Sequence, residues 1–223
     1  MVQVGTRLTT LHPAVERALE IELDSFTFRL VSPGDALFGS RLLFGGSFDP
    51  PHIGHQALLE SLVSEFPDAT LTLIPVHTHA FGKNLAPFKS RHRWCELLAK
   101  SISSRIEVSD IEATLDGSSL STVQHFQALE PDRRLVWVIG SDLLPTLSGW
   151  KGAEVLSQMV EFCVFQRAGA RTSKSSVSRE VNLPEISSTD LRVDLARGTV
   201  PKRGIPKVIL EDFLNDNPYF DRP

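Results

Sequence analysis

The segment Phe44–His55, which reads FGGSFDPPHIGH, combines glycines, an acid, prolines and two histidines in a pattern typical of an anion-binding turn. The two glycines permit a tight turn and a close approach of the backbone to a ligand. Asp49 is expected to cap the helix that follows, and the prolines suit the first turn of that helix. The N–H groups and the positive dipole end of the helix then face a ligand, which indicates a phosphate site.

His52 and His55 are three residues apart, so both lie on one face of the first helical turn. Two imidazoles beside a helix dipole suit a polyphosphate whose negative charge grows in a transition state. The alternatives are a metal pair and two surface histidines without a role. A metal pair needs further ligands, and the sequence shows no other His or Cys cluster at ligand spacing. We therefore expect a phosphate site and no metal ligands.

A second motif, ISSTDLR, occupies residues 186–192. Ser187 or Ser188 can cap a helix there, and Asp190 completes a pattern that resembles a capping box. Ser188 and Arg192 are four residues apart, so the hydroxyl and the guanidinium face the same way. Arginine suits phosphate because it donates two parallel hydrogen bonds. Taken alone, the motif is a plain capped helix with a surface arginine; together with the first motif, it predicts the other half of a phosphate clamp.

Short apolar runs alternate with helix-length amphipathic segments along the chain. The runs are Arg41–Phe44, Thr70–Val76, Arg105–Ser109, Leu135–Ile139 and Glu161–Phe165. The helical segments lie near 52–66, 88–103, 121–130, 142–158, 188–197 and 206–216. This alternation predicts an α/β fold with an open, doubly wound, Rossmann-like parallel sheet and helices on both faces. Such sheets bind ligands outside the carboxyl ends of their strands.

Residues 1–40 lie outside this alternation. They offer a short helical pattern at Pro13–Ile21 and one strand at Ser25–Val31. We expect a small N-terminal extension of unknown role, packed on the sheet edge or on a partner chain, before a domain that spans residues 41–223. A disordered tail is disfavoured, because apolar side chains such as Phe28 are costly to expose.

The 223-residue chain carries 23 Lys and Arg against 27 Asp and Glu, a formal net charge of −4, and is 41% hydrophobic. These values are ordinary for a globular protein, and a mildly acidic chain is not expected to be held by nucleic-acid backbone charge. We find no signal peptide and no apolar run near the roughly 20 residues that span a bilayer. The two lone cysteines, Cys95 and Cys163, favour a reducing cytosol. We expect a cytoplasmic protein without nucleic-acid or membrane partners, and whether it forms a homo-oligomer stays open.

GGSFDPPHIGH and ISSTDLR resemble the HxGH and ISSTxxR signatures of the nucleotidyltransferase superfamily, and the resemblance runs from about Leu42 to Phe213. The chain is most similar to bacterial nicotinate-nucleotide adenylyltransferases. The landmarks between the two motifs are VSDIE at 108–112, VIGSD at 138–142, the pair Trp150–Lys151 and an arginine, Arg167, after the run EFCVF. The resemblance implies adenylyl transfer from ATP to nicotinate mononucleotide in NAD biosynthesis, with release of pyrophosphate and formation of the dinucleotide. It also implies Mg²⁺ on the ATP phosphates and no covalent intermediate.

The resemblance also implies a role for individual residues. His52, His55 and Arg192 would be catalytic and act on the phosphates of ATP. The other ATP or phosphate contacts would be Gly45, Gly46, Ser47, Phe48, Ser187, Ser188, Gly140, Asp142 and Arg167. The mononucleotide acceptor would be bound by Lys83, Thr122, Trp150 and Lys151. Trp150 is equally well interpreted as a core aromatic.

Two loops carry basic residues whose roles stay open. Lys83 would bind the phosphate of the acceptor, with His79, Lys89 and Arg91 as alternatives, or it is a solvated loop lysine. The segment Ala168–Glu185 is Ser-rich and basic, and a loop of that length in a compact domain is functional or disordered. A lid that closes over the substrates is one hypothesis.

The sequence departs from the family in the segment Leu120–His125, where the family reads roughly SYTxDT. Thr122 is kept, but the aromatic is Ser121 and the acid is Gln124. In the family this segment helps to recognise the pyridine carboxylate, so nicotinamide mononucleotide or a phosphopantetheine stays open as the acceptor. A non-catalytic nucleotide-binding sensor is a further alternative. A class I aminoacyl-tRNA synthetase fragment is disfavoured by the short length, the negative charge and the ISSTDLR motif.

Overall fold

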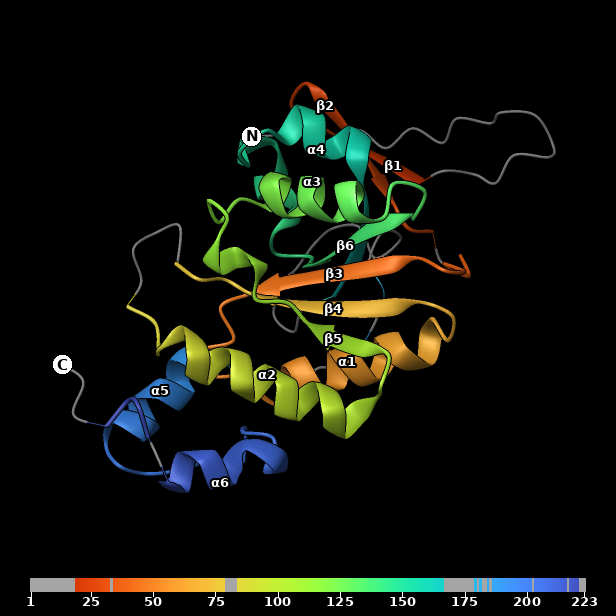
Figure 1. Ribbon diagram of the computed structural model, residues 1–223. Helices are drawn as coiled ribbons and strands as arrows, with labels where there is room; N and C mark the ends of the chain where they lie inside the picture. Colours follow the sequence, from red (N-terminus) through yellow and green to blue (C-terminus); the bar gives the residue numbers. More distant parts are fainter. Residues whose placement is uncertain are drawn as a thin grey trace.

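The computed structural model describes residues 19–32, 34–78, 84–166, 186–201, 203–215 and 217–220, together with residues 179, 181 and 184. These residues form a seven-stranded sheet with the order β1-β2-β7-β6-β3-β4-β5 (Figure 1). Its strands are β1 (Leu19–Leu23), β2 (Phe26–Leu30), β3 (Arg41–Gly46), β4 (Thr70–Pro75), β5 (Ile106–Val108), β6 (Leu135–Gly140) and β7 (Glu161–Phe165). In the described part of the chain every strand pairing is parallel except that of β1 with β2. The predicted α/β fold is confirmed.

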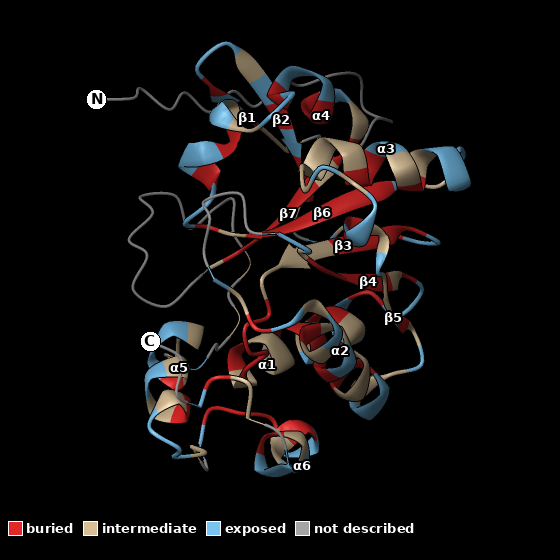
Figure 2. Cartoon of the chain, turned by 60° about the vertical axis from the view of Figure 1, so that its left-hand side comes forward, coloured by how far each residue is buried: buried red, intermediate tan, exposed pale blue. Residues whose placement is uncertain are grey.

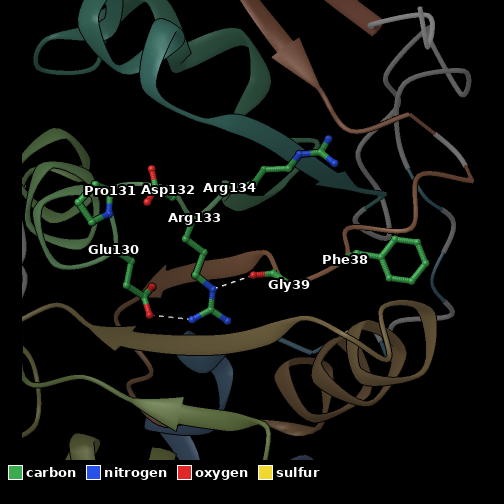
Figure 3. Close-up of a pocket in the computed structure, with 7 residues that line it drawn as sticks. All are labelled: Phe38, Gly39, Glu130, Pro131, Asp132, Arg133 and Arg134. Atoms are coloured by element: carbon green, nitrogen blue, oxygen red, sulfur yellow. Dashed lines mark hydrogen bonds and ion pairs between the residues drawn. The ribbon is translucent and has the colours of Figure 1, made fainter. Parts of the chain in front are cut away.

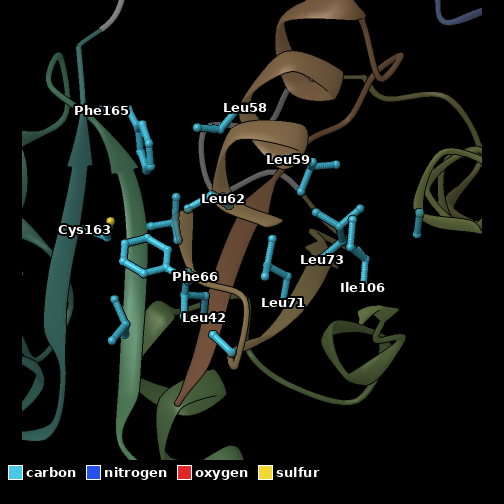
Figure 4. Close-up of a cluster of buried hydrophobic side chains, with 14 of the residues drawn as sticks. Leu42, Leu58, Leu59, Leu62, Phe66, Leu71, Leu73, Ile106, Cys163 and Phe165 are labelled. Carbon is cyan, nitrogen blue, oxygen red and sulfur yellow. The ribbon is translucent and has the colours of Figure 1, made fainter. Parts of the chain in front are cut away.

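The alternating side chains of β6 show why helices cover both faces of the sheet. Val136 and Val138 belong to one buried cluster, whereas Leu135, Trp137 and Ile139 belong to another. The first cluster, called the α1/α2 cluster, contains side chains of α1 (Ile53–Glu65) and α2 (Phe88–Ile102) (Figure 4). The second, called the α3/α4 cluster, contains side chains of α3 (Ser119–Leu129) and α4 (Ala153–Met159). Figure 2 shows β6 buried between these layers.

The strand order reverses between β3 and β6, because β4 and β5 follow on one side of β3 while β6 and β7 lie on the other. A parallel sheet leaves a crevice for ligands outside the carboxyl ends of its strands at such a point. Gly46 ends β3 and Gly140 ends β6, so both expected glycine positions lie at this edge of the sheet.

The helix expected over residues 13–21 is wrong where the structure describes it, because Leu19–Leu23 forms strand β1. Asp24 has a φ of 53° and turns the chain back, so β1 pairs antiparallel with β2. Apolar residues alternate on both strands, which puts Ile21 and Phe28 into the α3/α4 cluster. β2 in turn pairs with β7, so this hairpin extends one edge of the sheet.

The single helix expected over residues 142–158 is also wrong. A 3-10 helix η2 (Leu144–Gly149) is separated from α4 by a turn at Trp150–Gly152. Gly152 has a φ of +68°, a left-handed conformation that an α-helix cannot contain. The other expected helices and strands are present with ends shifted by no more than two residues, and a 3-10 turn η1 (Ile111–Ala113) precedes α3.

The C-terminal helices α5 (Ser188–Ala196) and α6 (Lys207–Asn215) pack on the end of α2 through a third apolar cluster, called the C-terminal cluster. The ring of Trp94 on α2 stacks on Phe213 of α6 with their centroids 4.6 Å apart. Tyr219 completes the cluster and is 3% exposed. This packing places the start of α5 against the start of α1. Across the described residues, none of the helices is long and apolar enough to cross a membrane.

Candidate active site

The glycines that end β3 are required by close packing as well as by the turn. A Cβ on Gly45 would lie 3.1 Å from Cζ2 of Trp137, and one on Gly46 would lie 3.2 Å from the ring of Phe48. Phe48 itself has a positive φ of 45° and is 1% exposed. Its ring centroid lies 5.0 Å from that of His55, so the phenyl ring is packed inside the loop. Any contact of residues 45–48 with ATP therefore involves the backbone rather than this phenyl ring.

The two histidines form a reciprocal capping box at the start of α1. The backbone N–H of Gly54 donates to Nδ1 of His52, and the backbone N–H of His52 donates to Nδ1 of His55, both at 3.1 Å. The ring centroids are 3.8 Å apart. Because each Nδ1 accepts a backbone hydrogen bond, the proton of each neutral imidazole is on Nε2. The start of α1 thus carries two Nε2–H donors beside the positive end of its dipole.

Asp49 does not cap α1, contrary to the prediction. Its carboxylate is 1% exposed, and Oδ1 accepts from the backbone N–H of Ala86 at 2.9 Å and from the hydroxyl of Tyr219 at 2.7 Å. The expected prolines in the first turn are also wrong, because Pro50 and Pro51 precede the capping residue His52. The imidazole of His52 supplies the cap, which leaves the Asp49 carboxylate to tie the loop to α2 and to the C-terminal cluster.

The structure brings the second motif onto the first. Ser187 caps α5 and accepts from the backbone N–H of Asp190 at 3.2 Å, as predicted for a capping box. The hydroxyl of Ser188 donates to the carbonyl of Pro50 at 3.1 Å. Arg192 donates from Nη1 to the carbonyl of Asp49 at 2.8 Å.

The starts of α1 and α5 are therefore in direct contact, although the two motifs are far apart in the sequence. Gly204, at the turn between α5 and α6, strengthens this contact. Its carbonyl accepts the backbone N–H of Ile53 at 2.9 Å. Gly204 has a φ of +109°, and a Cβ there would overlap the side chain of Ile186.

The end of β6 lies beside this contact at the same edge of the sheet. Ser141 is fully buried, and its backbone N–H donates to the carbonyl of Phe165 at 2.7 Å, which fixes the chain as it leaves Gly140. Asp142 is exposed. Arg167 lies outside the described residues.

Three of the four residues expected to bind the acceptor, Thr122, Trp150 and Lys151, lie on α3 or on the turn packed against its start. Thr122 is fully buried, and its hydroxyl donates to Oε1 of Glu112. Burial raises the pKa of the Glu112 carboxyl group. The hydroxyl of Thr122 therefore holds Glu112, and its direct contact with an acceptor stays a prediction. Lys151 forms an ion pair of 2.5 Å with Asp116. Trp150 is half-buried, and its indole N–H donates to the hydroxyl of Thr146 at 3.1 Å.

Of the basic residues considered for the acceptor phosphate, Lys83 and His79 lie outside the described residues, and Lys89 is exposed at the start of α2. Arg91 is 1% exposed and already bonded. Its guanidinium donates to the carbonyls of Ser47, Val76, His77 and Ala86. The buried side chain of Arg91 therefore links the loop after β3 to the loop after β4. No local pattern predicts this role, because Arg91 lies among other basic residues in an amphipathic helix.

Residues 43–194 match the model of the cytidylyltransferase-like family. A protein of Anaeromyxobacter dehalogenans strain 2CP-1, named "probable nicotinate-nucleotide adenylyltransferase", is 34% identical over 178 residues, which are 75% of this chain and 90% of that protein. A protein of the same name from Myxococcus xanthus is 34% identical over 166 residues, covering 74% and 86%.

The chain belongs to the nicotinate-nucleotide adenylyltransferases of the cytidylyltransferase-like family. It is therefore a nucleotidyltransferase, as the two motifs predicted. A solved structure of the nicotinic acid mononucleotide adenylyltransferase of Plasmodium falciparum, complexed with NaAD, shares the fold with a TM-score of 0.69. That structure is 20% identical and covers 81% of this chain and 97% of its own.

An open hollow of about 520 Å³ lies away from the family's two motifs (Figure 3). It is lined by Phe38, Gly39 and residues 130–134, which precede the amino ends of β3 and β6. Two of its charged groups pair with each other: Arg133 donates to Glu130, and also to the carbonyl of Gly39, both at 2.8 Å. Arg134 pairs with Glu161, which does not line the hollow. The hollow therefore lies at the amino ends of these strands, whereas the family's first motif lies at the carboxyl end of β3. In the part of the chain that is described, no group of three or more His, Cys, Asp and Glu could hold a metal ion.

Proposed function

We propose that this chain transfers the adenylyl group of ATP to nicotinate mononucleotide, which releases pyrophosphate and forms the dinucleotide of NAD biosynthesis. The observation that carries the proposal is the contact between the two helix starts. Ser188 and Arg192 of α5 bond to the carbonyls of Pro50 and Asp49, immediately before the histidine pair of α1. Donors from both motifs thus converge at the carboxyl end of β3, and the curated relatives carry the corresponding name.

The mechanism follows from these donors. A phosphate oxygen of the acceptor attacks the α-phosphorus of ATP, the bond from that phosphorus to the bridging oxygen breaks, and pyrophosphate leaves with the electron pair. The Nε2–H groups of His52 and His55 donate to phosphate oxygens as they gain charge, and Arg192 holds the β/γ end. Mg²⁺ enters as part of the ATP substrate. The reaction needs no protein nucleophile. Burial raises the pKa of the Cys163 thiol to about 12, so this cysteine stays a thiol and does not act as a nucleophile.

A second acceptor, nicotinamide mononucleotide, is favoured by the charge at the start of α3. The pKa of Asp116 is lowered by hydrogen bonds from Lys151, Ser121 and Ser118, so its carboxylate stays ionised. Lys151 is consequently neutralised by Asp116 rather than left as a lone positive charge for a nicotinate carboxylate. In such a setting a neutral carboxamide loses less binding free energy than a carboxylate does, because it needs no positive charge as a partner.

The test is pyrophosphate release from Mg-ATP with each acceptor in turn: nicotinate mononucleotide, nicotinamide mononucleotide and phosphopantetheine. We expect turnover with both pyridine nucleotides and no release without an acceptor. His92→Ala, which changes a histidine on α2 away from both motifs, is expected to keep wild-type rates. Absence of pyrophosphate with every acceptor would refute the proposal. We further propose a cytoplasmic setting, supported by two buried thiols, Cys95 and Cys163, that form no disulfide.

A further inference from the structure

Tyr219 lies near the end of the chain, yet its hydroxyl reaches the first motif. It donates to Oδ1 of Asp49 at 2.7 Å, across 170 positions of sequence. The ring is held on two sides by the C-terminal cluster, with its centroid 6.1 Å from those of Trp94 and Phe213. Burial first, and then the Asp49 carboxylate, raise the pKa of Tyr219, so its hydroxyl keeps its proton and remains a donor.

Asp49 connects this hydroxyl to the phosphate-binding arginine. Oδ1 of Asp49 accepts from both Tyr219 and the backbone N–H of Ala86, which fixes the plane of the carboxylate. Oδ2 then lies 3.7 Å from Nη1 of Arg192, and the same Nη1 donates to the backbone carbonyl of Asp49 at 2.8 Å. The side chain of Arg192 is 30% exposed. Asp49 therefore orients the guanidinium together with Thr189, whose hydroxyl accepts from Nη2 at 3.1 Å, and part of the guanidinium stays accessible.

We propose that Tyr219 is a positioning residue for Arg192 and acts on it through the carboxylate of Asp49. The inference rests on the proposed function, because it takes Arg192 as a ligand of the ATP phosphates. Without the hydroxyl, Oδ1 keeps only one donor and the carboxylate can rotate. Oδ2 then closes from 3.7 Å to hydrogen-bond distance of the guanidinium, and this tighter ion pair draws Arg192 away from ATP.

The test is a double-mutant cycle on Tyr219→Phe and Arg192→Lys. The readout is the Kd of a non-hydrolysable ATP analogue with Mg²⁺, measured by titration calorimetry, which requires no acceptor. Tyr219→Phe alone is expected to weaken binding about 10-fold, the scale of a hydrogen bond to a charged group. In the Arg192→Lys background the same change is expected to alter Kd less than about twofold, because lysine has no planar fork for Asp49 to orient.

A matched control separates positioning from a loss of stability. Ile209→Val removes one methylene group from the same C-terminal cluster and leaves Asp49 untouched. We expect it to lower the thermal midpoint at least as much as Tyr219→Phe while leaving the Kd of the analogue unchanged. In turnover assays, Tyr219→Phe is expected to raise the KM for ATP and to leave the KM for the acceptor unchanged.

Two results would overturn the inference: an equal loss of binding from Tyr219→Phe in both backgrounds, or no loss in the wild-type background. Failure of the proposed function is distinguishable from either. If the wild-type chain binds the analogue and the cycle shows coupling, but no acceptor releases pyrophosphate, then the proposed reaction is wrong and the role of Tyr219 stands.

Discussion

At the scale of single residues, His52 combines a structural and a chemical role that other capping residues cannot. Its Nδ1 accepts the backbone N–H of Gly54, as the side-chain oxygen of Ser, Asp or Asn would at the start of a helix. The ring also carries an Nε2–H, which is the donor that the proposed function assigns to the ATP phosphates. The side chain of Ser, Asp or Asn would cap the helix but would not supply the Nε2–H donor.

The substitution His52→Asn is therefore expected to separate stability from catalysis. Asparagine is a good capping residue, so the free energy of unfolding should stay within about 0.5 kcal/mol of wild type, whereas His52→Ala should lose about 1 kcal/mol. Both variants should lower kcat by roughly 100-fold or more, because each removes one donor to the developing charge. Denaturant unfolding and pyrophosphate release measure the two quantities. A kcat of His52→Asn within threefold of wild type would show that the Nε2–H is not needed.

The sequence reveals residues of this kind only when they lie in one contiguous motif. The shared face of His52 and His55 was predicted from helical spacing, as was that of Ser188 and Arg192. The catalytic roles of His52, His55 and Arg192 come from the resemblance to the family and stay predictions. The role of Asp49 was predicted wrongly, since its partner Tyr219 is 170 residues away and no local pattern connects them. The burial of Thr122 was missed for a different reason: the resemblance assigned this hydroxyl to the acceptor, whereas it donates to Glu112 of the preceding 3-10 turn.

At the scale of elements, the turn at Trp150–Gly152 packs against α3 and carries two of the residues expected to bind the acceptor. Gly152 is left-handed, and a Cβ there would overlap the side chain of Leu120 on α3. The close approach sets Lys151 against Asp116 at the start of the same helix. The turn and α3 thus form a unit that would carry Trp150 and Lys151 together.

We expect Gly152→Ala to raise the KM for the acceptor several-fold and to leave the KM for ATP unchanged. The added methyl group pushes α3 and the turn apart, and the positive φ adds about 1 to 2 kcal/mol of strain. Gly39→Ala is the matched control, since Gly39 has a φ of +63° with nothing within 4 Å of a Cβ. It should show similar strain in unfolding experiments with both KM values at wild type. A rise in the KM for ATP with Gly152→Ala would contradict this prediction, because it would show that the turn contributes to ATP binding.

The elements that the sequence predicted best are those buried on both faces. The apolar run of β6 is short and rich in β-branched and aromatic residues, which favours a strand buried between two helical layers over a buried helix. The helix expected over 142–158 failed because apolar spacing continues through a turn that the left-handed Gly152 makes possible. Leu19–Leu23 was extended rather than helical because its pairing with β2 outweighs local helical preference.

At the scale of the whole molecule, the hairpin β1–β2 lies outside the matched family model, which begins at residue 43, yet it is part of the core. Phe28 is fully buried, and its ring lies edge-on to that of Phe162 on β7 with centroids 5.6 Å apart. Both rings belong to the α3/α4 cluster with Trp137. The hairpin therefore shares a core with the family's sheet rather than having one of its own.

Phe28→Ala is accordingly expected to destabilise the entire described fold, by about 3 to 5 kcal/mol, in one cooperative transition. A phenyl ring lost from a core shared by β2 and β7 leaves a cavity against both strands, so the hairpin cannot melt without weakening the sheet. Phe38→Ala is the control, because Phe38 is 76% exposed and its loss should change the free energy of unfolding by no more than about 0.5 kcal/mol. Urea unfolding followed by tryptophan fluorescence and by far-ultraviolet circular dichroism measures this. If the two probes gave separate transitions in Phe28→Ala, with the later one at the wild-type midpoint, the hairpin would be an independent appendage, and the family's sheet would be stable without it.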